Sequence, residues 1–159
     1  MQTIDCRTGL GVLGRQGCLR CLASHPLGRV AVLVNGWPMI FPVNHHVVDS
    51  DTIVFRSDEV SKLAGVGGGL CMSLETDGID DAGRLWSVTA NGVGREIVDA
   101  WELERLRELG LEPYGPGPET HWLRIRPESI TGRRFTRLEW SVGVRRPVAL
   151  NGECDADCR

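Results

Sequence analysis

The chain has 159 residues, a length that suits one domain with a single core. Its 42% hydrophobic and 25% charged residues are typical of folded globular proteins and exclude disordered, collagen-like and coiled-coil chains. The net charge of −3 provides no broad basic surface, so nucleic acid is not expected as a partner. The 20 glycines and 8 prolines favour many short strands joined by turns.

The first half of the chain alternates strand and helix signals after an unassigned start over residues 1–13. Asn35-Gly36 lies between two strand-like runs and is a strong signal for a two-residue hairpin turn. Pro42 predicts a bulge or an edge position in the returning strand. The pattern predicts a helix over residues 15–24 and strands over 28–34, 39–48 and 52–56. A short helix follows, with Ser57 or Asp58 as its cap, and Gly65 stops it.

The second half of the chain contains longer strand patterns and one more helix. Asn91-Gly92 and Gly94 interrupt one strand, as expected where a barrel strand bends. Asp99 and Glu102 have the spacing of a capping box for the helix that follows. The pattern predicts strands over residues 70–77, 85–98, 121–126 and 129–135, a helix over 100–109, a Pro/Gly loop over 112–119 and no element beyond 136.

These elements predict a mainly β fold with six or seven mostly antiparallel strands and three short helices. A small barrel is the expected arrangement, because closure removes exposed strand edges and the bends at Pro42 and Gly92 supply corners. We expect an N-terminal extension over residues 1–14, one barrel domain over 15–135 and a C-terminal tail over 136–159.

The longest segment without Asp, Glu, Lys or Arg covers residues 30–48 and is nominally long enough to cross a membrane. Pro38 and Pro42 would leave helix carbonyls without partners in lipid, so we interpret this segment as a hairpin. The N-terminus lacks the ordered basic, apolar and small-residue zones of a signal peptide. We therefore expect a cytoplasmic protein that does not bind membranes.

The six cysteines include a CxxC pair at Cys18 and Cys21 and a second pair at Cys154 and Cys158. A structural zinc site normally has two compact pairs that frame a small knuckle, whereas 132 residues separate these two pairs. We expect unligated thiols and no metal site. A disulfide within the tail pair would need an oxidising compartment, against which the missing signal peptide argues.

The segment Phe55–Lys62 carries the clearest chemical signal. A strand that ends in Arg56 runs directly into a helix start, where the first backbone amides have no helical partner. Arg56, the hydroxyl of Ser57 and Lys62, the only lysine of the chain, would converge there on an anion such as a phosphate monoester. The alternative is a capped surface helix in which Lys62 pairs with Asp58.

The order of several segments resembles the FMN-binding split barrels related to pyridoxamine 5'-phosphate oxidase. The resemblance covers residues 15–135 and rests on the order and spacing of its parts rather than on any single motif. The segments that carry it are Gly28–Val32, Pro38–Asn44, Ile53–Ser57, Ser61–Leu63, Trp86–Val88 and His121–Arg133.

This resemblance implies a dimeric six- to seven-stranded split barrel, with two FMN molecules in clefts between the protomers. It implies no catalytic residue that can be named. The cofactor-binding residues that it implies are Arg56, Ser57, Ser61 and Lys62 at the phosphate, Pro42, Val43 and Asn44 at the ribityl chain and ring edge, Trp86 and Ser87 at the ring, and Trp122 and Arg133 from the partner chain.

Two of these residues have a structural alternative. Trp86 lies in an alternating strand, where a tryptophan more often belongs to the core. Asn44 could serve only the backbone near Pro42. The neighbouring His45 and His46 point to opposite strand faces, so they cannot hold one metal together, and neither receives a catalytic role.

The function implied by the resemblance is an FMN-dependent oxidoreductase that reduces or oxidises a small conjugated molecule by hydride transfer. The Arg-x-His arrangement with which true pyridoxamine phosphate oxidases hold their substrate is missing, which argues against vitamin salvage. A deazaflavin is the alternative cofactor. The alternative functions are a non-catalytic carrier or sensor of a flavin, deazaflavin or haem, and a dimeric scaffold with an empty cleft.

Overall fold

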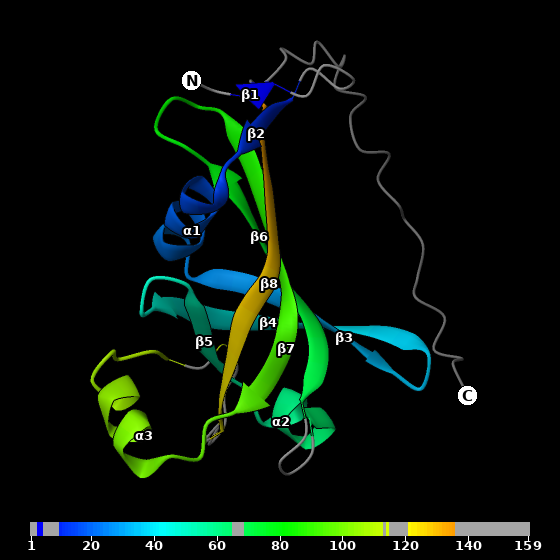
Figure 1. The fold of residues 1–159 in the computed structure, drawn as a ribbon, viewed down its shortest axis with the longest axis vertical. Helices are drawn as coiled ribbons and strands as arrows, with labels where there is room; N and C mark the ends of the chain where they lie inside the picture. The colour runs from blue at the N-terminus through cyan, green and yellow to red at the C-terminus, as the bar shows by residue number, and fades with distance from the viewer. Residues whose placement is uncertain (1–2, 5–9, 65–68, 113, 115–120, 136–159) are drawn as a thin grey trace, which may run out of the picture.

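The computed structural model describes residues 3–4, 10–64, 69–112, 114 and 121–135. It confirms a mainly β fold that is built on one antiparallel sheet (Figure 1). Three helices accompany the sheet in the described residues: α1 (Arg15–Ser24), α2 (Asp58–Ala64) and α3 (Ala100–Arg107). The strands are β1 (Thr3–Ile4), β2 (Gly11–Leu13), β3 (Leu27–Val34), β4 (Trp37–Val48), β5 (Thr52–Arg56), β6 (Leu70–Ile79), β7 (Leu85–Glu96) and β8 (Trp122–Phe135).

The sheet closes on itself through β8. The strand order is β1-β2-β8-β5-β4-β3-β6-β7, and a further pairing of β7 with β8 turns this order into a ring. One edge of β8 pairs with β7, and its other edge pairs first with β5 and then with β2. The split barrel is therefore confirmed, with β1 and β2 as an addition alongside β8.

The β3–β4 hairpin forms where the sequence predicts it. Asn35 and Gly36 have φ values of 50° and 83°, the left-handed conformations that a two-residue hairpin turn requires. Of the two predictions for Pro42, the edge position is confirmed and the bulge is absent. The β3–β4 register runs without a shift from Leu27↔Asn44 to Val34↔Trp37. Pro42 pairs only with β3, because β4 begins to pair with β5 at His45↔Phe55.

The long strand pair β7–β8 differs from the prediction in one respect. The two strands predicted over residues 121–126 and 129–135 are a single strand, β8. The predicted irregularity at Asn91-Gly92 is present, because the register passes from Asn91↔Ser129 to Gly92↔Pro127 and leaves Glu128 unpaired. This bulge lets β8 continue through Pro127, which has no backbone N–H to donate to a ladder.

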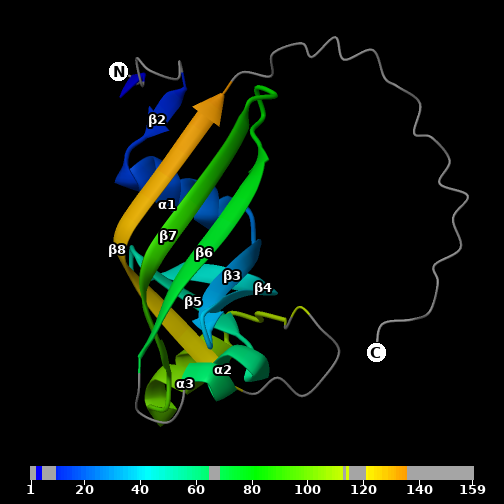
Figure 2. The same ribbon diagram turned by 90° about the vertical axis from the view of Figure 1, so that its right-hand side faces the viewer.

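The core fills the barrel with the inward-facing residues of all the ring strands. Leu22 of α1 packs against it, and the side chains buried deepest include Val30, Val43, Phe55, Leu74, Val88, Leu123 and Ile125. A second, smaller cluster lies on the outer face of β5 and β8, where Leu106 of α3 covers Val54 and Trp122. α2 and α3 lie at one end of the barrel (Figure 2).

His45 is a buried polar residue within this core. Its Nε2 lies 3.1 Å from the carbonyl oxygen of Leu22, which joins β4 to α1. A Cβ atom on Gly28 would lie 3.1 Å from Nδ1 of His45, so the close approach of β3 favours glycine there. Burial lowers the pKa of His45 to about 4.

No helix in the described ranges is long and apolar enough to cross a membrane. Cys18 and Cys21 are buried free thiols on α1, and Cys71 is an exposed one on β6. Within the described part of the chain, no three His, Cys, Asp or Glu side chains are placed together to hold a metal ion. The predicted tail over residues 136–159, with Cys154 and Cys158, lies outside the described residues.

Candidate functional site

Two of the predicted phosphate ligands have structural roles. Ser57 is buried and caps α2, because its Oγ accepts a hydrogen bond from the backbone N–H of Val60 at 3.2 Å. Ser61 is also buried, and its hydroxyl donates to Oε2 of Glu96 at 2.9 Å. Neither hydroxyl is presented on the surface of the barrel.

Glu96 joins three elements at this end of the molecule. Its Oε1 lies 2.6 Å from Nδ1 of His121, which precedes β8, while its other oxygen accepts from Ser61 of α2. The hydrogen bond with His121, more than that with Ser61, lowers the pKa of the Glu96 carboxyl. This network fixes α2 against β7, and the exposed Lys62 extends from the same helix.

Arg56 and Trp122 form the centre of a cleft on the outside of the barrel. They are register partners on β5 and β8, and the guanidinium of Arg56 lies 5.6 Å from the ring centroid of Trp122. Nη1 of Arg56 donates to the carbonyl oxygen of Leu111 at 3.3 Å. The cleft has a volume of about 270 Å³, and its lining also includes Arg107 and Glu112.

Asn44 belongs to the same neighbourhood, because its Nδ2 donates to the carbonyl oxygen of Glu112 at 3.1 Å. Of its predicted companions, Val43 is buried in the core and Pro42 is exposed. The structure thus brings Asn44, Arg56 and Trp122 together around residues 110–112. The guanidinium of Arg56 beside an aromatic wall suits a ligand with an anionic group and a flat ring, whereas that of Arg107 is paired with Glu104 at 2.7 Å.

The structure also places Arg107 and Glu112 at this cleft, and the sequence analysis did not name either residue. Arg107 is the last residue of α3, and Glu112 lies in the segment that follows. They lie near Arg56 only because α3 packs across the outer face of β5 and β8. The only local signal was the amphipathic pattern of α3, which indicates that one face packs against the protein without saying where.

Trp86, Ser87 and Arg133 lie elsewhere. Trp86 is 2% exposed, and its ring packs edge-on against His25 at a centroid distance of 4.6 Å, which is the core alternative considered for it. Ser87 pairs with Arg133 on β7 and β8. Arg133 is eleven residues along β8 from Trp122, roughly 35 Å of strand, so one flavin cannot contact both residues of one chain.

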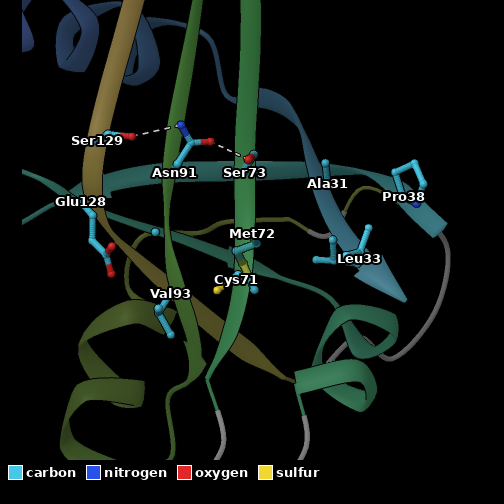
Figure 3. A pocket seen from close by; sticks show the side chains of 12 residues that line it. Ala31, Leu33, Pro38, Cys71, Met72, Ser73, Asn91, Val93, Glu128 and Ser129 are labelled. Atoms are coloured by element: carbon cyan, nitrogen blue, oxygen red, sulfur yellow. Dashed lines mark hydrogen bonds between the residues drawn. The ribbon is translucent and has the colours of Figure 1, made fainter. Parts of the chain in front are cut away.

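A second and larger cavity opens on the face formed by β3, β6, β7 and β8 (Figure 3). Its volume is about 500 Å³, and much of its wall is apolar, with Ala31 and Leu33 on one side. Asn91 of β7 lines it between Ser73 and Ser129; its Oδ1 accepts from Ser73 at 2.6 Å and its Nδ2 donates to Ser129 at 3.1 Å (Figure 3).

Comparison with known proteins identifies the class to which this barrel belongs. The sequence model of the pyridoxamine 5'-phosphate oxidase family matches residues 14–134, so the chain is a member of that family. The uncharacterized protein Rv0080 of Mycobacterium tuberculosis is 32% identical over 128 residues, covering 77% of this chain and 84% of Rv0080.

Two solved structures are similar in both sequence and fold. A candidate pyridoxamine 5'-phosphate oxidase of Corynebacterium glutamicum is 34% identical, with a TM-score of 0.70, over 80% of this chain and 98% of that one. An FAD-binding protein of Mycobacterium smegmatis is also 34% identical, with a TM-score of 0.64, over 79% of this chain and 97% of that one. The resemblance seen in the sequence is confirmed at the level of the family.

Proposed function

We propose that this protein binds a flavin nucleotide, with FMN as the expected form, and acts as an FMN-dependent oxidoreductase on a small conjugated molecule. The observation that carries this proposal is the cleft at Arg56 and Trp122, which combines a guanidinium with an aromatic wall in a family that includes a flavin-binding relative. The flavin, when bound, would supply the hydride chemistry.

The residues of this chain would hold the cofactor rather than react. Arg56 would bind the phosphate through charge-assisted hydrogen bonds, and the exposed ammonium of Lys62 would add a second positive charge. Trp122 would exclude water from one side of the bound molecule, and Asn44 would keep residues 110–112 in place through its bond to Glu112. Ser57 and Ser61 would act indirectly, by fixing the helix that carries Lys62.

A homodimer is part of this proposal, because the β3–β4 hairpin exposes large apolar side chains. Leu33, Trp37 and Ile40 are 65%, 73% and 64% exposed, and Met39 lies between them on β4. Their hairpin borders the apolar cavity of Figure 3, whose lining includes Leu33 and Pro38. Leu33 and Ile40 lie on one face of the hairpin and Trp37 and Met39 on the other. A hairpin that exposes so many apolar side chains favours a second copy of the chain as its cover.

Titration of the purified protein with FMN, FAD and a deazaflavin coenzyme, followed by fluorescence and native mass spectrometry, tests the cofactor. We expect tightest binding of FMN, and a loss of about tenfold or more in affinity for Arg56→Gln and for Lys62→Gln. Arg15→Gln removes an exposed arginine on α1 and should retain wild-type affinity. Unchanged affinity in both test variants, with the fold intact by circular dichroism, would overturn the proposal.

Turnover of the loaded protein separates the oxidoreductase from a carrier. Steady-state reduction of a quinone, with a reduced nicotinamide as the electron donor, supports the enzyme. Tight flavin binding without reduction of quinone or nitroimidazole acceptors by any reduced donor would instead favour the non-catalytic carrier or sensor.

A further inference from the structure

A second cleft on the outside of the barrel is rich in arginine and lies on the β7–β8 pair. The register places Val93 opposite Arg126 and Arg95 opposite Arg124. These four residues and Glu128 line a cleft with a volume of about 480 Å³. None of them lines the cleft at Arg56 and Trp122, so this feature is separate from the proposed cofactor site.

Only one of the three arginines in this cleft is neutralised by the protein. Nη1 of Arg124 lies 2.8 Å from both carboxylate oxygens of Glu102 on α3. Arg95 and Arg126 are exposed, and neither forms an ion pair with any residue in the described ranges. Arg95 lies directly opposite Arg124, and like charges in such a pair destabilise a sheet. Glu102 neutralises Arg124, whereas Arg95 has no carboxylate partner in the described ranges.

Gly69 borders this cleft. A Cβ atom added to Gly69 would lie 2.3 Å from Cγ1 of Val93 and 3.4 Å from Cζ of Arg95. The added atom would clash with Val93 and would only touch the guanidinium of Arg95. The backbone at Gly69 therefore lies beside Val93 and Arg95 at the edge of the cleft.

The charges at the cleft define the kind of anion that fits it. Arg95, Arg124 and Arg126 face the carboxylates of Glu102 and Glu128, which leaves one net positive charge. This balance suits a monoanion such as a carboxylate better than a phosphate dianion. Planar guanidinium groups also match a carboxylate through paired hydrogen bonds.

The surroundings of the cleft indicate what the rest of the ligand resembles. Val93 and Glu128 line both this cleft and the cavity of Figure 3, so the two are adjacent. That cavity offers apolar side chains such as Ala31 and Leu33. In the proposed dimer the second copy covers Leu33, so it would close the outer side of this cavity. We propose that this cleft is a binding site for a carboxylate that carries an apolar body, with Arg95 and Arg126 binding the carboxylate and the neighbouring cavity holding the body.

Benzoate is a suitable probe, because it combines a carboxylate with a small apolar ring. We would follow the Nε–Hε resonances of Arg95 and Arg126 by NMR during two benzoate titrations. The first uses the protein as purified, and the second uses the protein to which FMN has been added. We expect both resonances to shift saturably. Acetate should bind at least tenfold more weakly because it cannot fill the cavity, and inorganic phosphate should bind more weakly than benzoate.

The double variant Arg95→Gln/Arg126→Gln should lose at least tenfold in benzoate affinity. The matched control Arg15→Gln/Arg105→Gln removes two exposed arginines of α1 and α3 and should stay within twofold of wild type. Unchanged benzoate affinity in the first variant, equal affinities for acetate and benzoate, or tighter binding of phosphate would each overturn the proposal.

A further outcome would also overturn the proposal: FMN and benzoate compete, and Arg95→Gln/Arg126→Gln loses affinity for both. The cleft would then belong to the cofactor site. The proposed carboxylate site does not rest on flavin binding. A protein that binds benzoate but no flavin would refute the proposed function and leave this site supported.

Discussion

Nδ1 of His121 lies 2.6 Å from Oε1 of Glu96, and this contact joins the chain segment before β8 to the last residue of β7. The same carboxylate accepts a hydrogen bond from Ser61 of α2. One side chain thus connects a helix and two strand ends at the end of the barrel where α2 and α3 lie (Figure 2).

This relationship predicts how stability depends on pH through Glu96. Its pKa in the folded protein lies below the ordinary value of 4.5, so the carboxylate stabilises the fold above pH 4.5 and loses this effect as the pH falls through its folded pKa. We expect Glu96→Gln to lower the free energy of unfolding by about 1 to 2 kcal/mol at pH 7 and by less at pH 3. Urea denaturation at both pH values measures the difference.

Glu104→Gln is the control for this prediction. Glu104 pairs with Arg107 at 2.7 Å on the exposed face of α3, where an ion pair contributes about 0.5 kcal/mol or less. A loss in Glu96→Gln that stays constant from pH 7 to pH 3 would contradict the assigned role of the carboxylate.

His45 predicts a second and separate loss of stability in mild acid. Its folded pKa of about 4 lies below the 6.5 of an unfolded histidine. The folded protein therefore has its full stability above pH 6.5 and loses roughly 3 kcal/mol as the pH falls to 4, because the unfolded chain takes up the proton first. His45→Gln should remove much of this slope, and NMR should show that the His45 ring titrates near pH 4.

Phe55→Leu makes a useful comparison, because Phe55 is the register partner of His45 and has no titratable group. It should lower stability by a similar amount at both ends of this range and keep the wild-type slope. A wild-type slope in His45→Gln would show that another group controls stability in mild acid.

The β7–β8 bulge predicts an intolerant glycine. A Cβ atom on Gly92 would lie 2.5 Å from the backbone carbonyl oxygen of Arg126, which cannot move without breaking the strand pair. We expect Gly92→Ala to lower the free energy of unfolding by about 2 to 3 kcal/mol. Gly14→Ala, at the N-cap of α1 where no atom lies within 4 Å of the added Cβ, should cost about 1 kcal/mol or less. Equal effects of the two substitutions in thermal denaturation would count against this interpretation.

The proposed dimer predicts which surface substitutions separate the protomers. Ile40→Asp and Leu33→Asp each place a charge on the exposed apolar hairpin and should convert the dimer to a monomer at micromolar concentration. Val98→Asp alters an equally exposed apolar side chain away from that hairpin and should remain dimeric. Light scattering after gel filtration gives the mass. A monomeric wild type, or test variants that remain dimeric, would exclude this surface as the interface.

Local signals in the sequence predicted most of the barrel. Asn35-Gly36 adopts the positive φ values that define its turn, and Asp99 caps α3 by accepting from the backbone N–H of Glu102 at 2.8 Å. These features depend on neighbouring residues, so they are visible in the sequence. β1 and β2 were not predicted, because segments of two and three residues carry no period. β2 forms by pairing with β8, and β1 forms by pairing with β2.

The candidate site was only partly predictable. Which face of a strand points into the core is set by the register of the sheet. The alternation of apolar and polar residues in the sequence therefore could not show whether Trp86 of β7 faces the core or the surface. The hydroxyls of Ser57 and Ser61 were predicted to bind phosphate. Ser57 instead caps α2 locally through Val60, as the alternative of a capped helix predicted, whereas the use of Ser61 by Glu96 is a tertiary contact that no local pattern shows. The meeting of Asn44 with residues 110–112 depends on how α3 docks, which no local pattern encodes.

The late position of β8, the last strand in the described residues, has a consequence for synthesis. β5 and β7 both pair with β8, which is synthesised after them. About 25 residues separate β7 from β8, and more separate β5 from β8. During synthesis the incomplete ring therefore has two unpaired strand edges, on β5 and β7, which can pair with those of another nascent chain. A chain stopped before Trp122 would keep both borders open, and we expect it to aggregate rather than accumulate as a smaller barrel.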